Sequence, residues 1–170
     1  MKKIGLLIGV LTAPAWASTE PHQYFIGAKG GYQWPQDDSY EHSNPNGAIF
    51  GVYGGVQYSP AWSWDIGYQY HNDLKAETTT IKTWLIESAL RYDWYLQDNV
   101  SLYGRLGGAL WDMDKKNRFS DNLSAVGFSP LGEIGVNYTF SPNFRLSAGY
   151  QYIDSIGKSK TGKYDSHAAL

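Results

Sequence analysis

Seven segments of this 170-residue chain alternate between large apolar side chains and polar or small ones. A period of two is typical of β-strands whose two faces have different surroundings. The even-numbered positions form the apolar face of each segment, and every charged residue within the segments is odd-numbered. A helix over 81–96 would scatter its apolar side chains around the circumference, so we interpret that segment as a strand as well. The predicted strands span about residues 24–34, 49–58, 64–70, 84–94, 100–111, 131–140 and 144–153.

The odd-numbered face indicates which side of the sheet is enclosed. A solvated face, as in a soluble ligand-binding barrel, is normally rich in Lys, Glu, Thr and Ser. Here it carries isolated charges, four glutamines (Gln33, Gln57, Gln69, Gln151) and many glycines (Gly27, Gly31, Gly51, Gly55, Gly67, Gly107, Gly135, Gly149). Small residues beside a few long polar ones suit a crowded, narrow barrel interior. We therefore expect the odd face inside and the even face against lipid.

Aromatic residues make up 16% of the chain, and on the even face they gather near the predicted strand ends. Rings at both membrane–water interfaces form the two aromatic girdles of membrane barrels. The predicted girdle residues are Tyr24, Trp34, Tyr58, Trp64, Tyr70, Trp84, Trp94, Tyr138, Phe144 and Tyr152.

The connections alternate in length. Short turns are expected around residues 59–61, 97–99 and 141–143, and long polar stretches at about 35–48, 71–83 and 112–129. This layout is typical of outer-membrane barrels with short turns in the periplasm. The fold prediction is an all-β, transmembrane, antiparallel up-and-down barrel.

The N-terminus has the layout of a secretory signal. Lys2 and Lys3 precede an apolar run over residues 4–11, and the sequence Ala-Trp-Ala ending at Ala17 suits a signal peptidase. We expect a signal peptide over 1–17 and a barrel domain over 18–170. The chain has no cysteine, which excludes disulfides, zinc–thiolate sites and cysteine nucleophiles.

Six short motifs carry a family resemblance: IGAKGGY (26–32), YGGVQY (53–58), DIGY (65–68), YGRLGG (103–108), GVNY (135–138) and YQY (150–152). In this order they resemble the N-terminal transmembrane barrel of the OmpA family. The resemblance implies an eight-stranded, multi-pass barrel in the outer membrane, reached by Sec export. It also implies ligand-binding surface loops and a lumen that is plugged or weakly conducting.

Two features depart from the family pattern. The chain ends where an eighth strand should begin, so we expect about seven complete strands and about ten further residues of strand in a complete relative. The periplasmic domain that usually follows is not in this sequence, so peptidoglycan tethering is not expected for this chain.

Lys29 and Asp65 match the family's lumen lysine and its acidic partner, and their odd parity independently places both inside. We expect them to pair across the lumen, as a structural plug or as a gate, with Arg105, Arg145, Glu87 and Glu133 as alternative partners. Asn137 and Ser147 stand where the family usually has a strand-six acid and a strand-seven arginine. The whole predicted lumen network consists of Lys29, Asp65, Glu87, Arg91, Arg105, Glu133 and Arg145.

Other function classes have little support. Fourteen basic against sixteen acidic residues, with net charge −2, offer no surface for nucleic acid. The four histidines show no catalytic triad spacing, and we expect no catalytic residues, metal or cofactor. The alternative is an outer-membrane barrel enzyme that modifies lipid A or phospholipid. Expected partners of a monomeric barrel are outer-membrane lipids, lipopolysaccharide, and phage, toxin or host-surface ligands at the loops.

The signal layout predicts that the mature protein begins at Ser18. N-terminal sequencing of protein extracted from outer membranes checks this. Membrane-inserted protein that still carries Met1 would contradict it.

Overall fold

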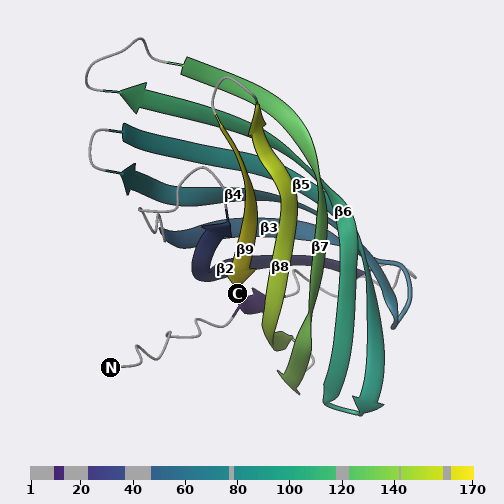
Figure 1. The fold of residues 1–170 in the computed structure, drawn as a ribbon. Helices are drawn as coiled ribbons and strands as arrows, with labels where there is room; N and C mark the ends of the chain where they lie inside the picture. Colours follow the sequence, from purple (N-terminus) through teal and green to yellow (C-terminus); the bar gives the residue numbers. More distant parts are fainter. Residues whose placement is uncertain are drawn as a thin grey trace, which may run out of the picture.

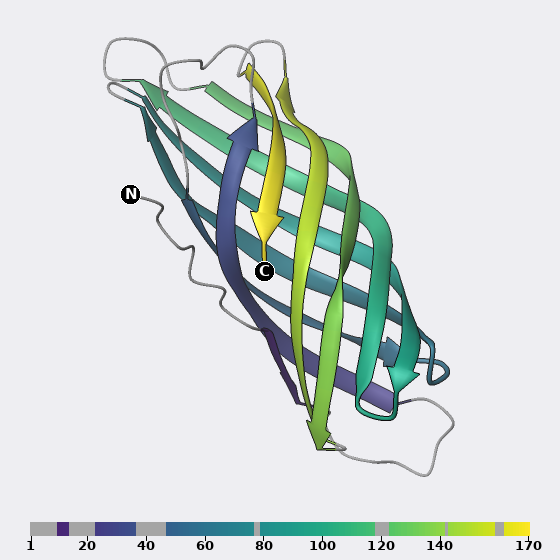
Figure 2. The same cartoon turned by 60° about the horizontal axis from the view of Figure 1, so that its bottom comes forward.

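The computed structural model describes residues 10–13, 23–36, 47–76, 79–117, 123–141, 143–158 and 162–170. Within them lies one antiparallel sheet, wound into a tilted, elongated barrel (Figures 1 and 2). No helix among these residues has the length and apolar character needed to cross a membrane. The strands are β1 (Val10–Ala13), β2 (Gln23–Gln36), β3 (Gly47–Gln57), β4 (Trp62–Ala76), β5 (Thr79–Gln97), β6 (Val100–Asn117), β7 (Leu123–Ser141), β8 (Phe144–Lys158) and β9 (Gly162–Ala169).

The strands β2 to β9 form a closed ring of eight. Each pairs with the next in chain order, and β9 also pairs with β2, with Tyr32 opposite Ala169. At its end, Leu170 exchanges two backbone hydrogen bonds of 2.9 Å with Gly149 of β8. The prediction of about seven complete strands was therefore wrong. The β9 sequence shows no apolar alternation, but its backbone is paired on both sides, which ring closure requires and a local pattern cannot reveal.

The short strand β1 lies between β2 and β8, on the short-turn side of Leu170. Leu11 stands opposite Ala28 on one side and Leu146 on the other. The residues that carry the predicted cleavage, Ala17 and Ser18, lie outside the described part of the chain.

Three short turns lie where they were predicted, between β3 and β4, β5 and β6, and β7 and β8. The strands extend further than predicted toward the other end of the barrel: β5 and β7 have 19 residues each. Segments expected as connections, such as 71–76 and 112–117, are strand. Alternating apolar side chains are expected only where a strand contacts lipid or a core. The backbone hydrogen bonds that pair two strands form without such contact, so these strand segments can be polar.

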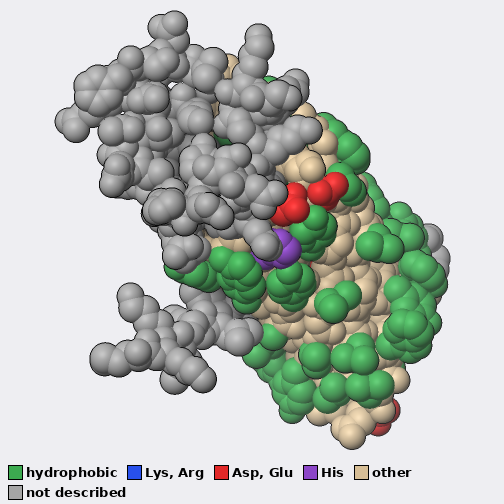
Figure 3. Space-filling view, in the orientation of Figure 1, with side chains coloured by type: hydrophobic (Ala, Val, Ile, Leu, Met, Phe, Trp, Pro, Cys, Tyr) green, Lys and Arg blue, Asp and Glu red, His purple; other side chains and the backbone are tan. Residues whose placement is uncertain are grey.

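The two faces separate as predicted by parity. Even-numbered apolar side chains such as Ile66 and Ile134 are exposed on the outer wall, which Figure 3 shows as green side chains over a tan backbone. Ser88 is a polar group on this wall, and it accepts a hydrogen bond of 3.0 Å from the Trp64 indole. The predicted girdle residues all lie on the outer face, with Tyr70 and Tyr152 half-exposed. Their grouping into two interfacial bands remains a prediction.

The lumen contains an apolar layer that the sequence analysis did not predict. We call it the apolar cap. On each strand its members stand on the long-loop side of the buried charges, and at most 3% of each is exposed. Ile156 joins it despite its even number because a bulge at Ser155, with φ of 50°, reverses the parity of β8. The cap consists of Leu85, Trp111, Met113, Leu131, Ile153 and Ile156.

If the cap is a packed core, Leu85→Ala should lower the free energy of unfolding by about 2–5 kcal/mol, because the cavity left inside cannot be refilled. Its neighbour Ile86 is 41% exposed on the outer wall. Ile86→Ala should cost less, since lipid can fill the space. Urea unfolding in lipid vesicles measures both, and equal losses would contradict a packed cap.

Candidate functional site in the barrel lumen

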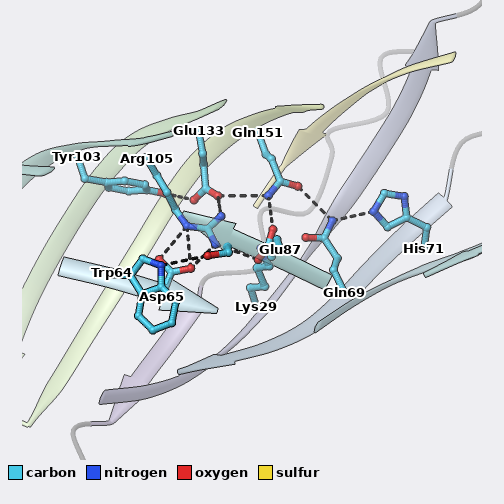
Figure 4. Close-up of polar contacts among 11 residues, drawn as sticks. Lys29, Trp64, Asp65, Gln69, His71, Glu87, Tyr103, Arg105, Glu133 and Gln151 are labelled. Carbon is cyan, nitrogen blue, oxygen red and sulfur yellow. Dashed lines mark hydrogen bonds and ion pairs between the residues drawn. The ribbon is translucent and has the colours of Figure 1, made fainter. Parts of the chain in front are cut away.

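Below the cap, five charged side chains from five different strands converge in the lumen (Figure 4). We call them the ionic layer. None is more than 9% exposed, although the layer combines two cations with three carboxylates. The members are Lys29 of β2, Asp65 of β4, Glu87 of β5, Arg105 of β6 and Glu133 of β7.

Arg105 is the centre of the ionic layer. Its Nε donates to Asp65 Oδ2 at 2.9 Å, and its Nη1 donates to Glu133 Oε2 at 3.1 Å. Its Nη2 lies 3.1 Å from Glu87 Oε1. The planar guanidinium has five N–H donors in a fixed fork, so one side chain can bind three carboxylates at once.

Lys29 pairs with Glu87 and not with Asp65. The predicted direct pair was therefore wrong, because Arg105 already binds both carboxylate oxygens of Asp65. Glycines provide the room for this arrangement. A Cβ at Gly51 would lie 3.2 Å from Lys29 Cγ, and a Cβ at Gly67 would lie 3.0 Å from Glu87 Oε1.

Neutral side chains complete the bonding of the carboxylates. The Tyr103 hydroxyl donates to Glu133 Oε1 at 2.8 Å, and Gln151 Nε2 donates to Glu87 Oε2 at 3.2 Å. Gln69 in turn donates to Gln151 Oε1 at 3.1 Å. The sequence analysis placed these glutamines on the inner face but did not assign them to the site. The sequence features that could have identified them as site residues were their odd-numbered positions and their long polar side chains.

A second polar cluster, which we call the Asp93 layer, lies on the short-turn side of the ionic layer. Arg91 donates to both carboxylate oxygens of Asp93, at 2.9 and 3.0 Å, and its Cζ lies 4.1 Å from the centre of the Tyr103 ring. Arg145 Nη1 lies 3.9 Å from Asp93 Oδ2. Arg91 and Arg145 thus belong to a cluster separate from Lys29, and its central acid, Asp93, was missing from the predicted network.

Asn137 and Ser147, which depart from the family pattern, form a chain of hydrogen bonds between uncharged side chains that ends at Asp93. Asn137 Nδ2 donates to Asp93 Oδ1, and the Ser147 hydroxyl donates to Asn137 Oδ1. Ser101 also donates to Asp93, at 3.3 Å. Buried hydrogen bonds therefore occupy positions at which the family pattern has an ion pair.

Two small cavities lie among the described residues of the lumen. A cavity of about 20 Å³, lined by residues of both polar layers, has room for about one water. A second cavity, of about 90 Å³, is lined by residues of the short-turn end, including Gln57, Ser141 and Arg145. Within the described part of the chain, no three His, Asp or Glu side chains are grouped as metal ligands.

Comparisons with known proteins agree with this geometry. The family described as "Outer membrane protein beta-barrel domain" matches residues 4–169. Outer membrane protein A of Escherichia coli O157:H7 is 27% identical over 175 residues, which cover 95% of this chain and 50% of that protein. This chain thus spans about half the length of the curated relatives it matches.

Two solved structures share the fold. Neisserial surface protein A superposes with a TM-score of 0.71 at 19% identity, covering 88% of this chain and 94% of that one. Ail, the attachment invasion locus protein of Yersinia pestis, was solved in complex with the heparin analogue sucrose octasulfate. It superposes with a TM-score of 0.56 at 17% identity, covering 95% of each chain.

Double-mutant cycles can test the pairing in the ionic layer. We expect a coupling energy of about 1–3 kcal/mol between Lys29→Met and Glu87→Gln, because these residues are in direct contact in a buried site. Coupling between Lys29→Met and Asp65→Asn should be clearly smaller. The measurement is again urea unfolding in vesicles. A larger coupling for Lys29 with Asp65 would contradict the observed pairing.

Proposed function

This chain belongs to the family of outer membrane protein β-barrel domains, and we propose that it is a structural and interaction barrel whose lumen is closed. It lies in the Gram-negative outer membrane, as its relatives do. The observation that carries the proposal is the filling of the lumen by three successive layers. Along β5 their members follow in order: Leu85 of the apolar cap, Glu87 of the ionic layer, and Asp93.

The apolar cap and the ionic layer block ions in different ways. The one polar group of the apolar cap, the Trp111 indole N–H, already donates to Ser129 Oγ, so the cap cannot replace the hydration shell of an ion and entry is costly. The ionic layer ties its charges to one another through Arg105, and moving one partner would leave another charge unpaired at low dielectric. A gate that exchanged partners within the ionic layer would still face the cap. We therefore favour the plug over the gate.

The outer wall supports the anchoring role. Its exposed apolar side chains cover the strands around the ring, and they include Leu106 and Ile134 at 74% and 66% exposure. Such a surface is stable against hydrocarbon and not against water. With the short turns in the periplasm, the opposite ends of the strands present the connecting segments to the cell exterior.

We further propose that these outer segments bind surface ligands, with lipopolysaccharide among the candidates. The support is by analogy: the similar Ail barrel was solved with a heparin analogue, a polysulfated sugar. In this chain the corresponding segments are 37–46, 77–78, 118–122 and 159–161, which lie outside the described residues. Phage, toxin or host-surface ligands remain proposals of the same kind.

The enzymatic alternative has no specific observation in its favour. Of the two described histidines, His71 is fully buried and contacts Gln69, and His167 contacts the Tyr150 hydroxyl. Neither contact includes the serine of a lipid-modifying triad. We therefore keep the non-catalytic barrel as the proposal.

Conductance in planar bilayers tests the closed lumen. The parent protein should show no steady channel, and neither Arg105→Ser nor Trp111→Gly alone should open one, because the other two layers stay in place. The triple variant that adds Arg91→Ser, which also breaks the Asp93 layer, should conduct. Leu110→Ala, on the outer face beside Trp111, is the matched control, and heat-modifiable gel mobility confirms a folded barrel. Steady conduction by the parent, or full opening by Arg105→Ser alone, would overturn the proposal.

A further inference from the structure

A groove of about 510 Å³ crosses the outer wall over strands β4 to β8. Its floor lies at Gly104 of β6 and Gly132 of β7, which stand at outward-facing, even-numbered positions of neighbouring strands. Leu106 stands opposite Gly132, and Ile134 stands opposite Gly104. The groove is thus a lateral gap in the apolar surface, and Arg105 and Glu133, whose side chains belong to the ionic layer, are also among its lining residues.

Packing within the barrel does not require these two glycines. A Cβ at Gly104 would meet no atom within 4 Å, and one at Gly132 would find only Leu106 Cδ2, at 3.7 Å. Inward glycines differ: a Cβ at Gly107 would collide with the Ser88 carbonyl oxygen, and one at Gly55 with that of Trp64. Glycine weakens a strand interior, and it often marks a place where a ligand or another backbone approaches closely. Nothing in the described chain approaches Gly104.

Aromatic side chains bound the groove at both ends. At one end Trp62 and Tyr92 pack edge to face with ring centroids 4.8 Å apart. At the other end stand Tyr150 and Tyr152, and the Tyr152 ring lies 5.0 Å from that of His167. These ring contacts hold the walls in place, so the groove is pre-formed. Figure 3 shows tan surface, which is backbone or polar side chains, between separated hydrophobic side chains on the face that carries β7 and β8.

We propose that this groove is a binding site for one acyl chain of a membrane phospholipid. It is continuous with the lipid-facing surface, so hydrocarbon chains are the groups that meet it. A second barrel is a poor occupant, because its convex wall cannot reach a glycine floor between projecting rings. A single chain is narrow enough to enter. The proposal rests on the membrane-spanning barrel and adds one defined lipid site to it.

The direction of the groove indicates which leaflet supplies the lipid. Trp62 begins β4 directly after a short turn, whereas Tyr150 and Tyr152 stand midway along β8. The four strand spacings from β4 to β8 cover about 19 Å, the scale of an extended acyl chain. The headgroup would lie near Trp62, at the short-turn interface, with the chain end near Tyr152. The occupant is therefore a phospholipid of the leaflet on the short-turn side.

Photo-crosslinking tests the site directly. The full chain is inserted in bilayers that contain phosphatidylethanolamine with a diazirine midway along one acyl chain, and labelled residues are identified by mass spectrometry. Relative to exposed area, labelling should concentrate at Leu106 and Ile134 over Val52 and Ile66, which face lipid elsewhere. The double variant Gly104→Leu with Gly132→Leu fills the floor and should lose this enrichment.

Gly54→Leu is the matched control. Gly54 is another even-numbered glycine, on β3, where a Cβ would lie 3.3 Å from the Phe25 carbonyl oxygen. It should keep the enrichment at Leu106 and Ile134. If the double variant does not fold, Gly104→Leu alone serves, since its Cβ meets open space.

Three outcomes would overturn the site. They are labelling in proportion to exposed area in the parent, enrichment that survives filling of the floor, and loss of labelling at high protein density together with dimers on native gels. The last would identify a second copy as the occupant. Absence of the heat-modifiable band in the parent would instead contradict the membrane barrel itself.

Discussion

Every backbone N–H and C=O group that faces hydrocarbon must find a partner within the protein, and this requirement determines the rest of the structure. A sheet in lipid can meet it only by closing on itself, because an open edge costs several kcal/mol for each unpaired group. The pairing of β9 with both β8 and β2 is the clearest consequence. Its sequence has none of the apolar alternation of the other strands, yet it completes the ring.

Closure with eight strands makes the interior narrow, and the interior sequence follows from that. Glycines admit the long side chains: a Cβ at Gly149 would collide with the Tyr103 hydroxyl, and a Cβ at Gly51 would crowd the Lys29 stem. The charges that enter such a space must be paired, since a buried ion without a partner is far more costly than a neutral group. Arg105 meets this need for three carboxylates at once.

The two kinds of glycine in this barrel show how different the inner and outer surfaces are. Inward glycines such as Gly107 are required, because neighbouring backbone occupies the place of a side chain. The outward Gly104 and Gly132 have free space around them. The first kind is explained by the fold. These two outward glycines are explained by the proposal that an acyl chain of the surrounding lipid binds against them.

The sequence alone determined the strand type, the inward and outward faces, the short turns and most of the buried charges, because parity is a local property of a β-strand. It did not determine which charges pair. Lys29 and Asp65 share a face, but strand tilt and register place Glu87 against Lys29 and Arg105 against Asp65. It also missed the apolar cap and β9. The cap exists only where side chains from four strands meet across the lumen, and β9 is a strand because the ring must close. Both are properties of the closed barrel and of no single segment.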